Sequence, residues 1–212
     1  MVDIALFPIP GSVSFPGHVV PLHVFEPRYR KMIQHCIDHE MLLGIAHTER
    51  VISEPQPKDN LKDTLSSNAA TYKPYSIFTA GVCSVNEILN DGRLLIEVTM
   101  TGRYRTIDKI QTLPFEIHRC EAYQDNPLTA DSEHNAEQLK QKILHRLTAL
   151  LADDNELQEL LNSPVITESS VTDFSFEIFQ LIRLAPSDLQ KALEARNPSD
   201  RLAIILDRLN NT

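Results

Sequence analysis

Short apolar runs, some alternating with polar residues and some continuous, are separated by prolines and glycines in the first half of the chain. Alternation over about four to eight residues is typical of a half-buried strand, and a short continuous run is typical of a buried one. Proline fixes φ and removes a hydrogen-bond donor, so a strand either ends at a proline or carries it at a sheet edge. The runs expected to be strands are residues 4–7, 19–25, 41–46, 75–89, 93–101, 104–110 and 115–122.

One helix and one hairpin are predicted within this half. Pro27 suits the first turn of a helix, with Glu26 placed favourably for the helix dipole. Asp91-Gly92 lies between two apolar arms, which is a strong hairpin signal, and Gly102 indicates a bend or bulge beyond it. The predicted apolar stripe of the helix is Tyr29, Met32, Ile33, Cys36 and Ile37. The predicted core residues of the hairpin are Val82, Val85, Ile88, Leu94, Ile96 and Val98.

Two polar stretches interrupt the pattern. Residues 49–74 are predicted to be a long loop, a feature that is usually functional or disordered. Residues 124–131 contain turn-forming residues and are the expected linker.

Beyond residue 131 the apolar spacing changes to that of helices. The predicted stripes are Ala136, Leu139, Ile143, Leu147, Leu150 and Leu151; then Phe174, Ile178, Leu181 and Ile182; then Leu202, Ile205, Leu206 and Leu209.

The sequence therefore predicts an α+β protein of two domains. Residues 1–123 are expected to form a partly closed β-barrel with one short helix, and residues 132–212 are expected to form a helical bundle.

A family resemblance accompanies this pattern. Nearly the whole chain, and residues 5–32 most specifically, resembles the N-terminal substrate-recognition domain of the ATP-dependent Lon proteases, found also as a stand-alone bacterial protein. The resemblance implies a PUA-like pseudo-barrel followed by helices, and a protein that binds polypeptide segments or a protein partner. The segments that carry it are Leu6-Phe7-Pro8, Phe15-Pro16-Gly17, Val20-Pro21-Leu22, Val24-Phe25-Glu26-Pro27-Arg28-Tyr29, Gly81-Val82, Gly102-Arg103-Tyr104-Arg105 and residues 184–209.

Charge and cysteine content narrow the function classes. The net charge of -9, negative in both halves, argues against nucleic acid or an anionic membrane as the main partner. Cys36, Cys83 and Cys120 are odd in number and lie in apolar segments, so reduced thiols are expected. The chain has no signal-peptide pattern and no apolar run long enough to span a membrane, so the cytoplasm is the expected location.

The sequence offers little catalytic chemistry. None of its six glycines belongs to a phosphate-binding loop, and the motor and the Ser-Lys peptidase of full-length Lon enzymes are missing. His35 and His39 share a helix face at a spacing that can bind zinc, but solvated histidines are the preferred interpretation. Cys83 is interpreted as a structural thiol. We therefore expect no catalytic residue, no metal and no cofactor, and a protein that is not an enzyme.

A peptide-binding surface is the main functional hypothesis. The residues that could form this surface could equally well be buried in the core or form ion pairs within the protein. The alternatives are a small-ligand protein or enzyme with a site at the junction of barrel and bundle, and an adaptor that contacts a partner through its helices. The candidate residues are Phe15, Pro21, Phe25, Tyr29, Arg103, Tyr104 and Arg105.

Overall fold

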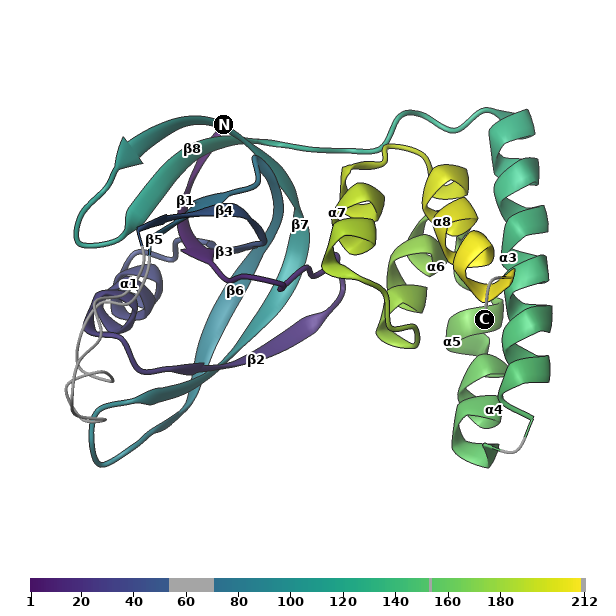
Figure 1. The fold of residues 1–212 in the computed structure, drawn as a ribbon, viewed down its shortest axis with the longest axis horizontal. Coiled ribbons are helices and arrows are strands. Elements are labelled where there is room, and N and C mark those ends of the chain that lie inside the picture. Colours follow the sequence, from purple (N-terminus) through teal and green to yellow (C-terminus); the bar gives the residue numbers. More distant parts are fainter. Residues whose placement is uncertain (54–70, 153, 211–212) are drawn as a thin grey trace. The chain divides into compact units, whose positions relative to one another are not determined.

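The computed structural model describes residues 1–53, 71–152 and 154–210. The chain divides into two units, Met1–Tyr123 and Gln124–Thr212. Unit 1 contains the strands and one helix, and unit 2 contains helices, as Figure 1 shows. This is the α+β fold class that the sequence predicted.

Among the described residues of unit 1, six strands form one sheet in the order β2-β7-β6-β3-β1-β8. An additional pairing of β7 with β8 brings the sheet back on itself, which is compatible with the predicted pseudo-barrel. β4 and β5 form a separate two-stranded sheet. The strands are β1 (Val2–Pro8), β2 (Val19–Val24), β3 (Leu43–Ala46), β4 (Thr48–Ser53), β5 (Thr71–Pro74), β6 (Ile77–Ile88), β7 (Leu94–Gln111) and β8 (Glu116–Ala122).

The long strand β7 organises this sheet, because it pairs with β2 and β6 and, further along, with β8. β6 and β7 approach each other closely at Gly81, beside a register shift between Ala80 and Gly81. A Cβ atom at Gly81 would lie 1.8 Å from the Thr99 carbonyl oxygen, so no other residue fits without moving the backbone. The expected hairpin is confirmed, but β7 continues through Gly102 where two separate strands were predicted.

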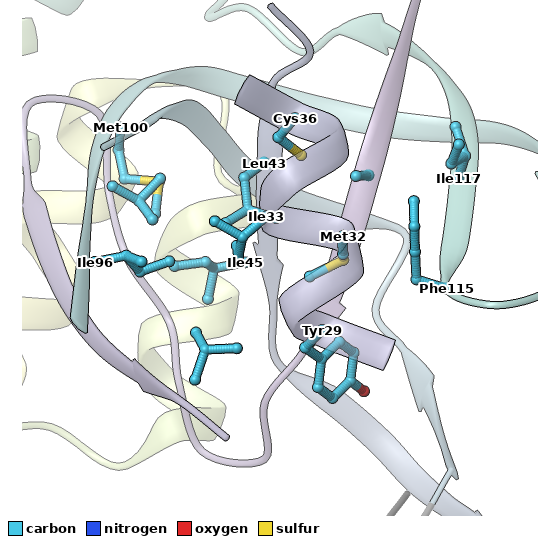
Figure 2. Packing of buried hydrophobic residues seen from close by; sticks show 13 residues of the cluster. Tyr29, Met32, Ile33, Cys36, Leu43, Ile45, Ile96, Met100, Phe115 and Ile117 are labelled. Atoms are coloured by element: carbon cyan, nitrogen blue, oxygen red, sulfur yellow. The ribbon is translucent and has the colours of Figure 1, made fainter. Parts of the chain in front are cut away.

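Helix α1 (Pro27–Asp38) covers one core cluster of unit 1. A second core cluster is formed by Ile4, Leu6, Ala46, Phe78, Ala80 and Cys120. Figure 2 shows the side chains of α1 directed toward residues of β3, β7 and β8, including Ile45, Ile96 and Ile117. Four members of the predicted stripe are buried, whereas Ile37 is 43% exposed and does not belong to it. The four buried members are Tyr29, Met32, Ile33 and Cys36.

Unit 2 is built around α8, which packs against α3, α6 and α7. Its buried apolar residues include Ile143, Phe174 and Ile205, one from each of three helices. The elements are α3 (Ala130–Leu150), α4 (Asn155–Leu161), α5 (Pro164–Thr167), α6 (Val171–Glu177), η1 (Ile178–Gln180), α7 (Pro186–Glu194) and α8 (Pro198–Asn210).

A buried arginine ties the start of unit 2 to its last helix. The Arg201 guanidinium on α8 is 0% exposed and donates two hydrogen bonds to the Asp125 carboxylate, at 2.7 and 2.5 Å. It also donates to Ser175 Oγ and lies 3.9 Å from the Phe176 ring centre. Two parallel hydrogen bonds make an arginine–carboxylate pair specific in geometry as well as strong. Asp125, which was expected in a linker, is therefore fixed to the helical unit.

Several other predictions differ from the structure. The predicted loop 49–74 contains part of β4 and all of β5, and its residues 54–70 lie outside the described residues. Val82 and Ile88 are 60% and 68% exposed and are not core residues. On α3 the buried position is Lys140 rather than Leu139, because the Lys140 ammonium donates to the carbonyl oxygens of Thr167 and Ser169.

We predict that Gly81→Ala destabilises unit 1 by about 2 kcal/mol or more, because the added methyl group cannot fit beside β7. Gly102→Ala is the matched control, since its Cβ would meet nothing nearer than 3.5 Å. The control should change the free energy of unfolding by less than about 1 kcal/mol. Urea unfolding of both variants tests the prediction, and equal effects would show that the close approach is unimportant.

Candidate functional site

Three adjoining cavities in unit 1 surround the start of α1, and all three are lined in part by Arg28. We call them together the α1 groove. The most apolar part has a volume of about 360 Å³ and lies between residues of β1 and residues of β2. The other two parts, of about 110 and 460 Å³, extend toward Leu113 and Pro114. The lining of the 360 Å³ part is Phe7, Pro8, Ile9, Pro10, Leu22, His23, Val24, Phe25, Glu26, Arg28, Tyr29 and Tyr72.

The local sequence around Pro27 places the aromatic wall of this groove. Glu26 is the N-cap residue and Pro27 begins the helix, which brings Arg28 and Tyr29 onto its first turn. The Tyr29 ring packs on Phe7, with 4.1 Å between ring centres. The Arg28 guanidinium lies over the Tyr29 ring, 4.5 Å from the ring centre, and donates to the Glu26 carboxylate at 2.9 Å. The groove wall is therefore held by packing, an ion pair and a cation–π contact.

Two apolar side chains of the groove remain accessible to solvent. Phe25, immediately after β2, is 36% exposed, and Leu113, between β7 and β8, is 80% exposed. Leu113 precedes a cis peptide bond to Pro114. Exposed apolar residues that border a concave apolar surface are typical of an interaction site.

The polar groups of the groove are few. Burial raises the pKa of Tyr29 to about 12, with Arg28 acting in the opposite direction, so its hydroxyl remains protonated at neutral pH. Glu116 lines the part of the groove that has a volume of about 110 Å³. Burial alone would raise the pKa of Glu116, but hydrogen bonds donated by His118 and Lys109 outweigh it and hold the pKa below its usual value.

The predicted peptide-binding residues lie in different parts of unit 1. Phe25 and Tyr29 line the α1 groove, and Pro21 is exposed on β2. Phe15 is 1% exposed and packs inside, where the neighbouring Ser14 hydroxyl is hydrogen-bonded to Thr79. It does not reach the groove.

The three predicted residues on β7 are not grouped with these. Arg103 is buried, with its guanidinium 5.2 Å from the Tyr123 ring centre. Tyr104 packs against the second core cluster of unit 1, and Arg105 is paired with Glu121. Sequence reasoning missed Phe7, Tyr72 and Leu113, whose segments are far from Tyr29 along the chain.

The histidines and cysteines singled out in the sequence do not form a metal site among the described residues. Among residues 1–53, 71–152 and 154–210, no three His, Cys, Asp or Glu side chains are grouped so that they could hold a metal ion. The His35 and His39 rings stack at 4.1 Å on the last turn of α1. A hydrogen bond from Cys36 lowers the pKa of Cys83, and both thiols are free. No described helix is both long enough and apolar enough to cross a membrane.

Comparison with known proteins identifies the family. A family model described as the substrate-binding domain of ATP-dependent protease La (LON) matches residues 3–211. The chain belongs to this family. The resemblance to Lon N-terminal domains carried by the segment around Pro27 is therefore confirmed over nearly the whole chain.

Curated relatives of this Lon-type domain are much longer. A Lon protease of Anaeromyxobacter dehalogenans is 24% identical over 97% of this chain, which corresponds to 22% of the relative. The LON peptidase N-terminal domain and RING finger protein C14F5.10c of Schizosaccharomyces pombe is 22% identical over 92% of this chain and 43% of its own length. The chain thus spans less than half the length of these relatives.

Solved structures share the Lon-type fold along the whole chain. The N-terminal domain of a Mycobacterium avium complex Lon protease matches with a TM-score of 0.67 at 14% identity, covering 99% of this chain and 98% of that one. A Lon N-terminal domain protein from Xanthomonas campestris matches with a TM-score of 0.58 at 19% identity, covering 98% of each. At these identities the likeness establishes the fold.

We predict that the Glu116 carboxylate stabilises unit 1 at neutral pH and loses this effect in acid. Its pKa is lower in the folded protein than in the unfolded chain, so the stabilisation is complete above the unfolded value and is lost as the pH falls through the folded value. Urea unfolding should show Glu116→Gln less stable than the wild type above about pH 5, with a difference that shrinks below about pH 4.

Glu121→Gln is the matched control for this prediction. Glu121 lies on the same strand and pairs with Arg105, but both side chains are exposed, and exposed ion pairs contribute little to stability. This variant should follow the wild type across the pH range. A Glu116→Gln difference that stayed constant from neutral pH to pH 3 would refute the role given to this carboxylate.

Proposed function

We propose that this chain binds exposed apolar segments of other polypeptides in the α1 groove and leaves them chemically unchanged. The observation that carries the proposal is a concave apolar groove with two accessible apolar side chains in its lining, Phe25 and Leu113. Burying such side chains against a partner gains roughly 25 cal/mol per Å² of apolar surface.

The family supports the same proposal. Its model is described as a substrate-binding domain, and the relatives that carry this region include Lon proteases. A protease acts on polypeptides, so a domain that binds its substrates must recognise polypeptide chains. The α1 groove is the apolar surface of unit 1 best suited to this, because its walls are already ordered by the Phe7–Tyr29 and Arg28–Tyr29 contacts.

Binding without catalysis also fits the chemistry of the chain. The sequence contains no phosphate-binding loop. The negative net charge disfavours nucleic acid, whose affinity for proteins comes largely from Lys and Arg contacts to phosphates. Arg28 is the positively charged residue shared by all parts of the groove, and it is already paired with Glu26.

A permanently unfolded model chain tests this proposal. Reduced, carboxymethylated and fluorescein-labelled α-lactalbumin should bind the purified protein with saturation of its fluorescence anisotropy. Phe25→Asp and Leu113→Asp should each weaken binding by about tenfold or more, because each removes apolar contact worth about 1.5 kcal/mol and brings a charge to the groove.

Val82→Asp is the matched control. Val82 is 60% exposed on β6, between Phe25 and Leu113 in accessibility, and does not line the groove, so this variant changes an accessible apolar residue elsewhere on unit 1. It should bind as the wild type does. The proposal fails if no binding is measured at high micromolar protein, or if all three variants weaken binding equally.

A further inference from the structure

Strand β2 lies at the edge of the main sheet of unit 1. In the part of the chain that the structure describes, β2 pairs with β7 along one side, and the strand order places no strand on the other. An edge strand presents a row of backbone N–H and C=O groups to which another extended chain can pair.

The register tells which backbone groups of β2 face outward. The Met100 amide donates to the His18 carbonyl oxygen at 2.9 Å, immediately before the first residue pair, Val19 with Thr99. In an antiparallel pair, every second residue directs both its N–H and its C=O toward the partner strand. No register shift interrupts the pairing from Val19 to Val24. Residues 20, 22 and 24 therefore bond to β7, and residues 19, 21 and 23 direct their backbone groups away from it.

The position of proline in this strand agrees with the assignment. Pro21 has no N–H, and it occupies one of the outward positions, where no bond to β7 is lost. It removes one donor from the free edge and leaves the carbonyl oxygen of residue 21 and both backbone groups of Val19 and His23. A proline at an edge limits indiscriminate pairing with other chains. The remaining edge is short, and it is still long enough for a few residues of an extended peptide.

This free edge opens onto the α1 groove. Leu22, His23 and Val24 line the 360 Å³ part of the groove, and Phe7 to Pro10 line it from β1 and the loop that follows. Leu22 and Val24 direct their side chains inward, as their burial shows, whereas His23 is exposed. A chain that paired with the edge would place alternate side chains beside Leu22 and Val24, and so into the groove.

We infer that an extended polypeptide segment binds the α1 groove by adding a strand to the free edge of β2. This inference rests on the proposed function and specifies how the bound segment is recognised. Main-chain hydrogen bonds to Val19, the Pro21 carbonyl and His23 hold the segment, and every second side chain, apolar and bulky, enters the groove. Recognition through the backbone accepts many sequences, so the site selects chains that are extended and carry alternating apolar residues.

Backbone methylation of the ligand tests the inference. The probe is a fluorescein-labelled nine-residue peptide with a central phenylalanine flanked by alternating threonine and valine. Two derivatives carry N-methyl groups on alternate residues. In one, the methylated residues are the phenylalanine and the valines; in the other, they are the threonines. Strand addition predicts that one derivative loses affinity by about tenfold or more while the other binds like the parent, because only one series donates to β2.

Substitutions in β2 test the same hydrogen bonds from the side of the protein. His23→Pro and His23→Ala both remove the imidazole, but only the proline removes the outward N–H. We expect His23→Pro to bind the parent peptide about two- to tenfold more weakly than His23→Ala does. Pro21→Ala restores a donor at the edge and should tighten binding by a similar factor. Leu22→Pro, which removes a bond to β7, should instead destabilise unit 1 in urea unfolding.

The outcomes separate the two proposals. If the peptide binds but both N-methyl derivatives bind equally well, and His23→Pro matches His23→Ala, strand addition is overturned and the groove hypothesis stands. If neither the peptide nor the unfolded model chain binds, both proposals fail. Loss of stability in His23→Pro comparable to that of Leu22→Pro would show that the assigned backbone directions are wrong.

Discussion

The close contact between β6 and β7 at Gly81 is the constraint on which the rest of unit 1 depends. It lets one long strand, β7, pair with β2 and β6 and then continue to β8. Because β7 takes part in all these pairings, it contributes Ile96, Val98 and Met100 to the core cluster that α1 covers. The same arrangement leaves β2 at the edge of the sheet, and the groove forms where the first turn of α1 meets the ends of β1 and β2.

The sequence correctly predicted the elements that depend on contacts between residues close together in the chain. Pro27 and the helical stripe predicted α1, and Asp91-Gly92 predicted the turn between β6 and β7, because both depend on residues that are neighbours in the chain. The prediction that Val82 and Ile88 are buried was wrong, because an apolar residue on a strand does not reveal which face of the sheet will be covered. Gly102 was expected to mark a bend or bulge between two strands. A register shift does lie beside it, where Ala80 and Gly81 of β6 pair with Gly102 and Met100, but β7 continues through Gly102 because pairing with β6 supports the backbone on both sides.

The α1 groove could be predicted only in part, because a sequence pattern indicates contacts between chain neighbours but not between distant segments. Phe25 and Tyr29 lie four residues apart at a strand-to-helix junction, so their nearness follows from the sequence. Phe7, Tyr72 and Leu113 reach the groove from segments brought together by the sheet, and no local pattern distinguishes them from ordinary core or loop residues. Lys140 and Arg201 in unit 2 show the converse. Both are charged residues inside apolar surroundings, and hydrogen bonds to the carbonyls of Thr167 and Ser169 or to Asp125 make their burial tolerable.

The features that make unit 1 stable also restrict what its groove can bind. Tyr29 belongs to the core and to the groove at once, so the groove wall cannot move without disturbing the packing of α1. A rigid apolar wall loses little conformational entropy when a ligand binds, but it cannot adapt to many side-chain shapes. Broad recognition of different polypeptides must then come from groups that every polypeptide shares. Backbone N–H and C=O groups are the only such groups, and the free edge of β2, moderated by Pro21, is where unit 1 presents complementary ones beside the groove.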